Sequence, residues 1–88
     1  MVKAKVEVIN RAGLHARAAS KLVELTSSFV SEIKIGHEKI VDGKSILSLM
    51  MLAATKGTEL TIEVHGSDEQ EALSAIVNLI NDRFEESD

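Results

Sequence analysis

Two hydrophobic periodicities alternate along this chain, and their alternation constrains the fold more than any other feature. Apolar residues occupy every second position in residues 2–8, 33–35 and 60–64, a pattern typical of half-buried strands. Elsewhere they recur at three- and four-residue spacing, as in amphipathic helices. Since 88 residues provide for one sheet-and-helix core but not two, we expect residues 1–88 to form a single domain.

The order of these segments predicts the arrangement β-α-β-β-α-β-α. The expected elements are a strand at 2–8, a helix at 16–28, a hairpin at 31–43, a helix at 45–57, a strand at 58–66 and a helix from 67 onward. Each strand has one apolar face, which a single layer of helices can cover. We therefore expect an α+β fold in which a four-stranded antiparallel sheet carries three helices on one side.

Residues with known capping preferences mark two of the three helices. Asp42 or Ser45 can cap the start of the second helix, and Gly57 is a suitable glycine to end it. Ser67, followed three residues later by Gln70, resembles a capping box for the last helix. The first helix alone begins without Ser, Thr, Asp or Asn.

Composition argues against several classes of protein. The net charge is −4 and the only aromatic residues are Phe29 and Phe84, whereas nucleic-acid-binding proteins are usually basic and stack bases on aromatic rings. No Cys is available for a disulfide, and no apolar run is long enough to cross a membrane. The first residues lack the apolar stretch of a signal peptide, so we expect a cytoplasmic protein. His37 and His65 lie at no metal-ligand spacing, and we expect neither a metal nor a cofactor.

Charge is distributed unevenly along the chain. Residues 8–23 contain no Asp or Glu, although the chain has 14 of them. Four basic or titratable side chains lie in this segment: Arg11, His15, Arg17 and Lys21. Much of the acidic excess lies in residues 81–88, which we interpret as a frayed, solvated end. We therefore expect no carboxylate to compete for an anion near the start of the first helix.

His15 occupies the position where the first helix should have a cap. An uncapped helix N-terminus has unpaired N–H groups and a partial positive charge, so it can bind a phosphate. Gly13 permits a tight turn just before it, and Arg17 can pair with phosphate oxygens. A neutral imidazole is also a nucleophile, so His15 could itself take a phosphoryl group, held by the N–H groups of Ala16 and Arg17. The alternative is a half-exposed loop histidine without a function.

The motifs "GLHARAAS", "KSILSLM" and "AATKGTELTI" resemble the HPr family of histidine-containing phosphocarriers of the phosphoenolpyruvate:sugar phosphotransferase system. The resemblance covers essentially the whole chain and implies an open-faced β-sandwich of the connectivity given above. It also implies that His15 accepts a phosphoryl group on Nδ1 from Enzyme I and passes it to a IIA domain. The chain would then be a phosphocarrier and not an enzyme, with Arg17 as its phosphate-binding arginine.

Two features of the resemblance leave the branch of the family open. The family usually has Pro after the arginine, where this chain has Ala18. The segments "VEVINRAGLHAR", "LMMLAATKG" and "NLINDRFEESD" resemble the nitrogen-type paralogue NPr at least as well as the sugar-type carrier.

The second helix is apolar on more than one face. Leu49, Leu52 and Ala53 share a face and are expected in the core. A helix on one side of a sheet buries only one stripe, so Ile46, Leu47 and Met50 are then left partly exposed. Such a patch suggests docking, and the resemblance implies Enzyme I and IIA domains as partners. Overpacking of a small core is the alternative.

Ser45 has two interpretations. A serine at this place is most often a helix cap. Within "KSIL" it also matches the regulatory serine that HPr kinase/phosphorylase modifies, and a phosphate there would place charge beside the apolar patch.

Two further classes of function remain open from the sequence. One is a regulatory binding module that acts through the Ser45 helix and no longer relays phosphate, although the presence of His15 and Arg17 argues against it. The other is a small ferredoxin-like ligand-binding domain, for which no residues mark a pocket.

Overall fold

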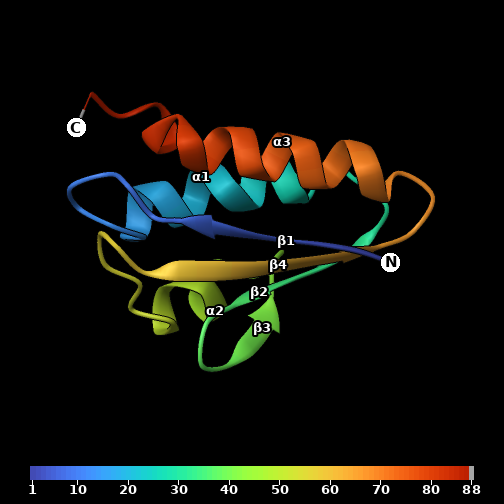
Figure 1. Ribbon diagram of the computed structural model, residues 1–88, viewed down its shortest axis with the longest axis horizontal. Helices are drawn as coiled ribbons and strands as arrows, with labels where there is room; N and C mark the ends of the chain where they lie inside the picture. The colour runs from blue at the N-terminus through green and yellow to red at the C-terminus, as the bar shows by residue number, and fades with distance from the viewer. Residues whose placement is uncertain (88) are drawn as a thin grey trace.

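The computed structural model describes residues 1–87 and contains the predicted order of strands and helices (Figure 1). The elements are β1 (Val2–Glu7), α1 (Ala16–Thr26), β2 (Glu32–Gly36), β3 (Ile40–Asp42), α2 (Ile46–Met51), β4 (Glu59–His65), α3 (Glu69–Asn81) and the short 3-10 helix η1 (Arg83–Glu85). The chain thus adds one short turn, η1, whose three residues have positive φ and which the sequence pattern did not predict. None of the helices in this described part of the chain is long and apolar enough to span a membrane.

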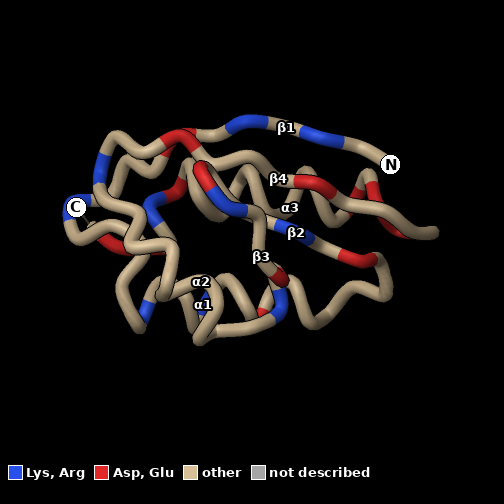
Figure 2. Tube along the Cα trace, turned by 90° about the horizontal axis from the view of Figure 1, so that it is seen from below, with Lys and Arg blue, Asp and Glu red and all other residues tan. Residues whose placement is uncertain are grey.

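The four strands form one antiparallel sheet in the order β1-β4-β2-β3, which confirms the predicted α+β architecture. Val6 of β1 lies opposite Leu60 of β4, and Ile62 of β4 lies opposite Ile35 of β2. Because side chains alternate across a strand, this register places these apolar side chains on the same face. The other face carries lysines and glutamates, which colour the strands blue and red in Figure 2.

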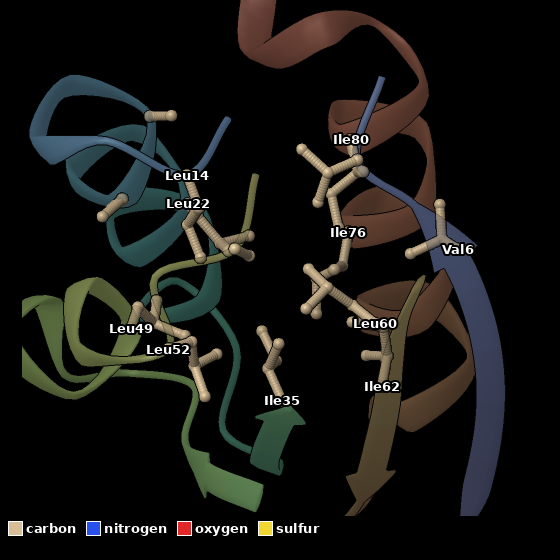
Figure 3. Close-up of a cluster of buried hydrophobic side chains, with 14 of the residues drawn as sticks. Val6, Leu14, Leu22, Ile35, Leu49, Leu52, Leu60, Ile62, Ile76 and Ile80 are labelled. Atoms are coloured by element: carbon tan, nitrogen blue, oxygen red, sulfur yellow. The ribbon is translucent and has the colours of Figure 1, made fainter. Parts of the chain in front are cut away.

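All three α-helices contribute to one core on the apolar face of the sheet. α1 and α3 run side by side over the sheet (Figure 1), while α2 packs against α1 and lies next to β3. Figure 3 shows Leu22, Leu49 and Ile76 converging with the strand residues, and all three are fully buried. Burying a side chain of this size typically contributes about 1.5–3 kcal/mol, so this core is the main source of stability for the fold.

The second helix ends earlier than predicted. α2 stops at Met51, with Leu52 as its C-cap, and not at Gly57. Ala53 then adopts a left-handed conformation with φ 51°, which turns the chain so that Ala54 points inward and is buried while Ala53 is exposed. The expectation that Ala53 lies in the core is therefore wrong, whereas Leu49 and Leu52 are buried as predicted.

The start of α3 also differs from the prediction. Asp68, not Ser67, is the N-cap residue, and its side chain makes no capping hydrogen bond. Its carboxylate accepts instead from the backbone N–H groups of Val30 and Ser31 at 3.0 Å each, and from the Ser31 hydroxyl. The Ser31 hydroxyl contributes most to lowering the pKa of Asp68. Asp68 thus fixes the connection between α1 and β2, and Glu69 accepts from the Gly66 N–H at 3.1 Å.

The acidic C-terminal segment is packed and not frayed over its described residues, contrary to our expectation. Phe84 in η1 is fully buried. Lys21 of α1 and Glu85 form an ion pair at 3.0 Å. The segment therefore folds back against α1, at the same end of the molecule as the loop between β1 and α1 (Figure 1).

The left-handed conformation of Ala53 predicts that Ala53→Gly stabilises the protein. A non-glycine residue at positive φ costs about 1 kcal/mol or more, and glycine adopts this conformation without steric penalty. We expect a gain of about 0.5–1 kcal/mol after the larger entropy of the unfolded chain is taken into account. Thermal unfolding measures this gain as a rise of a few degrees in Tm.

The matched control is Ala75→Gly, the same chemical change within α3. It should lower the stability by about 1 kcal/mol. A fall in Tm for Ala53→Gly would contradict a left-handed helix end at this position.

Candidate functional site

The imidazole of His15 caps α1. His15 has an extended backbone (φ −80°, ψ −179°), and its Nδ1 accepts a hydrogen bond from the Arg17 N–H at 3.2 Å. The first N–H bonded to a carbonyl within the helix is that of Ala19, which donates to the His15 carbonyl at 2.8 Å. The predicted cap position of His15 is confirmed. Ala18 is fully buried at the third helical position, where a helical N–H has no partner within the helix.

The loop before His15 is held against the segment that follows α2. The Leu14 N–H donates to the Ala54 carbonyl at 2.9 Å, and the Leu14 side chain is buried. Gly13 has φ 70°, and a Cβ at this position would lie 2.5 Å from the Ala54 oxygen. Only glycine allows the loop this close approach, so Gly13 contributes to placing His15 at the start of the helix.

A carboxylate from the end of the chain contacts the other ring nitrogen of His15. Glu86 Oε2 lies 2.5 Å from His15 Nε2, and Glu86 Oε1 accepts from Asn10 Nδ2 at 3.1 Å. The expectation that no carboxylate lies near this site is therefore wrong. The contact is made by a residue 71 positions away in the sequence, because burial of Phe84 brings the end of the chain to the start of α1.

The environment of Glu86 favours its charged form. Burial raises the pKa of this carboxyl group, but the hydrogen bonds from Asn10 and His15, together with the positive charge of Arg17, outweigh it. The net effect is a pKa below the usual value. Glu86 is therefore a carboxylate at neutral pH and can only accept hydrogen bonds at its oxygens.

His15 and Arg17 share an open hollow at this end of the molecule. Its lining consists of Arg11, Ala12, His15, Arg17, Lys21, Glu85, Glu86 and Ser87. The hollow combines three cationic side chains and the N-terminus of α1 with two carboxylates, so its net charge stays positive and attracts anions. Of the predicted site residues, His15 and Arg17 thus line one hollow, and Ala16 lies between them as the first residue of α1.

The predicted docking residues lie on α2, outside this hollow. Leu47 is 70% exposed, and Ile46 and Met50 are each about 40% exposed. Met51, which the sequence prediction did not include, is 73% exposed. Ser45 is the N-cap of α2, where its hydroxyl accepts from the Ser48 N–H at 3.2 Å, which confirms its capping role.

The two other histidines lie apart from the hollow. His37 is exposed and its Nε2 is 3.1 Å from the Leu52 carbonyl oxygen. His65 is exposed, with Nδ1 at 4.0 Å from Glu69. Within residues 1–87 no three His, Cys, Asp or Glu side chains come together as a candidate metal site.

Sequence reasoning missed Asn10 and Glu86 at the site. Asn10 is a fully buried polar residue in the loop after a strand, where its sequence context resembles that of any loop asparagine. One signal for Glu86 was available, since Phe84 continues the apolar stripe of the last helix. That continuation indicates that the end of the chain packs, although it does not indicate against what.

Comparisons with known proteins agree with this geometry. Residues 2–82 match the family described as the PTS HPr component phosphorylation site. Phosphocarrier protein HPr of Pseudomonas aeruginosa is 48% identical over 86 residues, which cover 96% of each chain. Phosphocarrier protein NPr of Escherichia coli is 38% identical over 87 residues, or 97% of each chain. The HPr relative is thus the more similar of these two, although the sequence segments alone favoured neither type.

Solved structures show the same fold. The crystal structure of HPr-C-His from Thermoanaerobacter tengcongensis superimposes with a TM-score of 0.95 at 38% sequence identity and covers 99% of both chains. A second structure, HPr from Bacillus anthracis, has a TM-score of 0.84 at 38% identity and covers 88% of this chain and 93% of that one. The resemblance drawn from the sequence motifs is confirmed, and the chain belongs to the HPr family of phosphocarrier proteins of the phosphotransferase system.

Proposed function

We propose that His15 accepts a phosphoryl group on Nδ1 from phosphorylated Enzyme I and transfers it to a IIA domain. The observation that carries this proposal is the capping contact of Nδ1 with the Arg17 N–H. A nitrogen that accepts a hydrogen bond carries a lone pair, and this lone pair is the nucleophile. A phosphoryl group bonded to Nδ1 would take the place of the capping contact, with its oxygens facing the first N–H groups of α1.

Arg17 is the side chain that would bind the phosphoryl oxygens as the group moves. It is exposed in the first turn of α1, and its guanidinium offers several N–H donors that match a phosphoryl group. Its charge also helps to keep Glu86 ionised, because it lowers the pKa of that carboxyl group.

The exposed apolar side chains of α2 are the surface through which we propose that Enzyme I and IIA domains dock. We define this surface, the α2 patch, as Ile46, Leu47, Met50 and Met51. Phosphorylation of Ser45 by an HPr kinase/phosphorylase would place a dianion at its edge. The main effect would be weaker docking, because the charge would lose hydration in the complex.

His15→Ala should abolish labelling by phosphoenolpyruvate and Enzyme I. Phosphohistidine is labile in acid and phosphoserine is stable, so acid treatment distinguishes the two. The variant should still fold, with a loss of about 1 kcal/mol because the cap is removed. Acid-labile label in this variant would contradict the assignment, and His65→Ala, which alters an exposed histidine far from the hollow, should retain the label.

Arg17→Ala should leave the fold intact and slow phosphoryl transfer. One charge-assisted contact to the phosphoryl group is lost, which corresponds to roughly a tenfold lower rate. Rapid-quench measurements of transfer from Enzyme I and to a IIA domain test both directions. Wild-type rates in both directions would exclude Arg17 from the site.

Met50→Glu and Ser45→Asp should each weaken binding of Enzyme I. Both place a carboxylate in or beside the α2 patch, where docking would remove its water. Titration calorimetry should give a Kd raised roughly tenfold or more, which is about 1.4 kcal/mol. Gln70→Glu, which adds the same charge at an exposed position on α3, is the control, and wild-type affinity in both patch variants would contradict docking through α2.

A further inference from the structure

The two ring nitrogens of His15 make hydrogen bonds of opposite sense. Nδ1 accepts from the Arg17 N–H at 3.2 Å and therefore carries the lone pair. Nε2 lies 2.5 Å from a carboxylate oxygen of Glu86, which can only accept, so Nε2 carries the hydrogen. These two contacts select a single neutral tautomer, the one in which Nδ1 carries the lone pair that can attack phosphorus once the bond from the Arg17 N–H is released.

Asn10 fixes the Glu86 carboxylate in this position. Both N–H bonds of the Asn10 amide are used, one to the Gly13 carbonyl at 2.8 Å and one to Glu86 Oε1 at 3.1 Å. Asn10 is fully buried, and its Oδ1 has no hydrogen-bond partner among residues 1–87. Rotating the amide would turn that oxygen toward two acceptors, so the orientation is fixed and presents an N–H to the Glu86 carboxylate.

An unusual backbone turn aims Glu86 at the ring. Arg83, Phe84 and Glu85 have φ values of 56°, 54° and 66°, a conformation that is unfavourable for residues other than glycine. Burial of Phe84 and the Lys21–Glu85 ion pair hold the turn. Glu86 then returns to an extended conformation, with its side chain directed back across the start of α1.

We propose that Glu86 is a positioning residue for phosphoryl transfer through His15, and that Asn10 holds it in place. The inference deepens the proposed function and rests on it. Glu86 would act on the reaction through the ring, by keeping the hydrogen on Nε2 and by stabilising positive charge that develops on the imidazole.

The charge that develops on the ring during transfer explains why a carboxylate beside Nε2 would help. The Nδ1 lone pair forms the N–P bond, while the bond from phosphorus to the donor breaks and its electron pair stays with the donor. The hydrogen on Nε2 remains in place, so the ring becomes cationic. A carboxylate hydrogen-bonded to that hydrogen stabilises the cation, as the aspartate does in a Ser-His-Asp triad, and transfer to the acceptor reverses each change.

The negative charge of Glu86 could also repel the incoming phosphoryl group, and geometry decides between the two effects. Glu86 contacts the Nε2 edge of the ring, whereas the N–H groups that would receive the phosphoryl oxygens lie at the Nδ1 edge. The other charged side chains around the hollow are Arg11, Arg17, Lys21 and Glu85. Three of these four are cationic, so the phosphoryl group would approach through a net positive surrounding.

Glu86→Gln is the variant that tests the inference. The two oxygens of Glu86 accept hydrogen bonds from His15 and from Asn10. A glutamine amide has one acceptor oxygen and one donor nitrogen for the same two partners. If its N–H₂ faces His15, it favours the tautomer with hydrogen on Nδ1, which opposes the Arg17 N–H. If its N–H₂ faces Asn10 instead, it lies against the Asn10 N–H₂ and neither group has an acceptor. Glu71→Gln, at an exposed position near the other end of α3, removes the same charge and is the matched control.

We expect two results from Glu86→Gln. Nitrogen-15 chemical shifts of the neutral His15 ring should show loss of the single Nε2–H tautomer, which a merely structural role of Glu86 would not produce. The rate of phosphorylation by Enzyme I should fall roughly tenfold, the difference between a charge-assisted and a neutral hydrogen bond. Glu71→Gln should match the wild type in both measurements, and Tm should show that both variants are folded.

An unchanged tautomer and rate in Glu86→Gln would overturn the inference, and so would a faster rate, which would mean that repulsion dominates. These outcomes are distinct from failure of the proposed function. If the wild type is labelled and His15→Ala is not, an unaltered Glu86→Gln contradicts only the role of Glu86. If the wild type takes no label, the proposed function fails and the inference fails with it.

Discussion

The hydrogen bond between the Arg17 N–H and the His15 imidazole is the interaction on which the functional end of this molecule depends. A helix start needs acceptors for its unpaired N–H groups, and most helices supply a hydroxyl or carboxylate oxygen. Here a titratable nitrogen supplies the acceptor. The stability of α1 and the orientation of the His15 ring are therefore properties of the same contact, which a phosphoryl group on Nδ1 would have to replace.

Two parts of the chain distant in sequence support this contact from opposite sides. The loop before His15 is held by the segment that follows α2, because Gly13 allows the backbone to approach the Ala54 oxygen closely. The other side of the ring is held by Glu86, which Asn10 fixes in turn. The site thus depends on the core itself, since Leu14 and Phe84 are buried and anchor both supports.

The short length of α2 leaves an apolar surface exposed. A helix of six residues inserts few side chains into the core, and Leu49 is the one that is fully buried. The remaining large apolar side chains face outward as the α2 patch, which borders the Ser45 cap. Because the left-handed Ala53 ends the helix and redirects the chain toward Gly13, the geometry that shortens α2 also supports the loop that carries His15.

The sequence by itself determined the strands, the order of elements, the antiparallel sheet and the position of His15 at a helix start. The strands and their order follow from local hydrophobic periodicity. The place of His15 follows from the absence of Ser, Thr, Asp or Asn at the start of the first helix. The sequence did not determine where α2 ends, which residue caps α3 or where Glu86 lies. Ala53 takes an unfavourable backbone conformation because Ala54 is buried next to it, and Asp68 is engaged by Val30 and Ser31 from another part of the chain.

The position of Glu86 is the largest difference between the sequence prediction and the structure. Its acidic segment is typical of a solvated end, and no local pattern distinguishes it from one. Only burial of Phe84 brings it to Asn10, which lies 76 positions earlier in the chain. Local sequence therefore determined that an imidazole stands at the start of α1, whereas packing between the two ends of the chain decided which carboxylate contacts its Nε2.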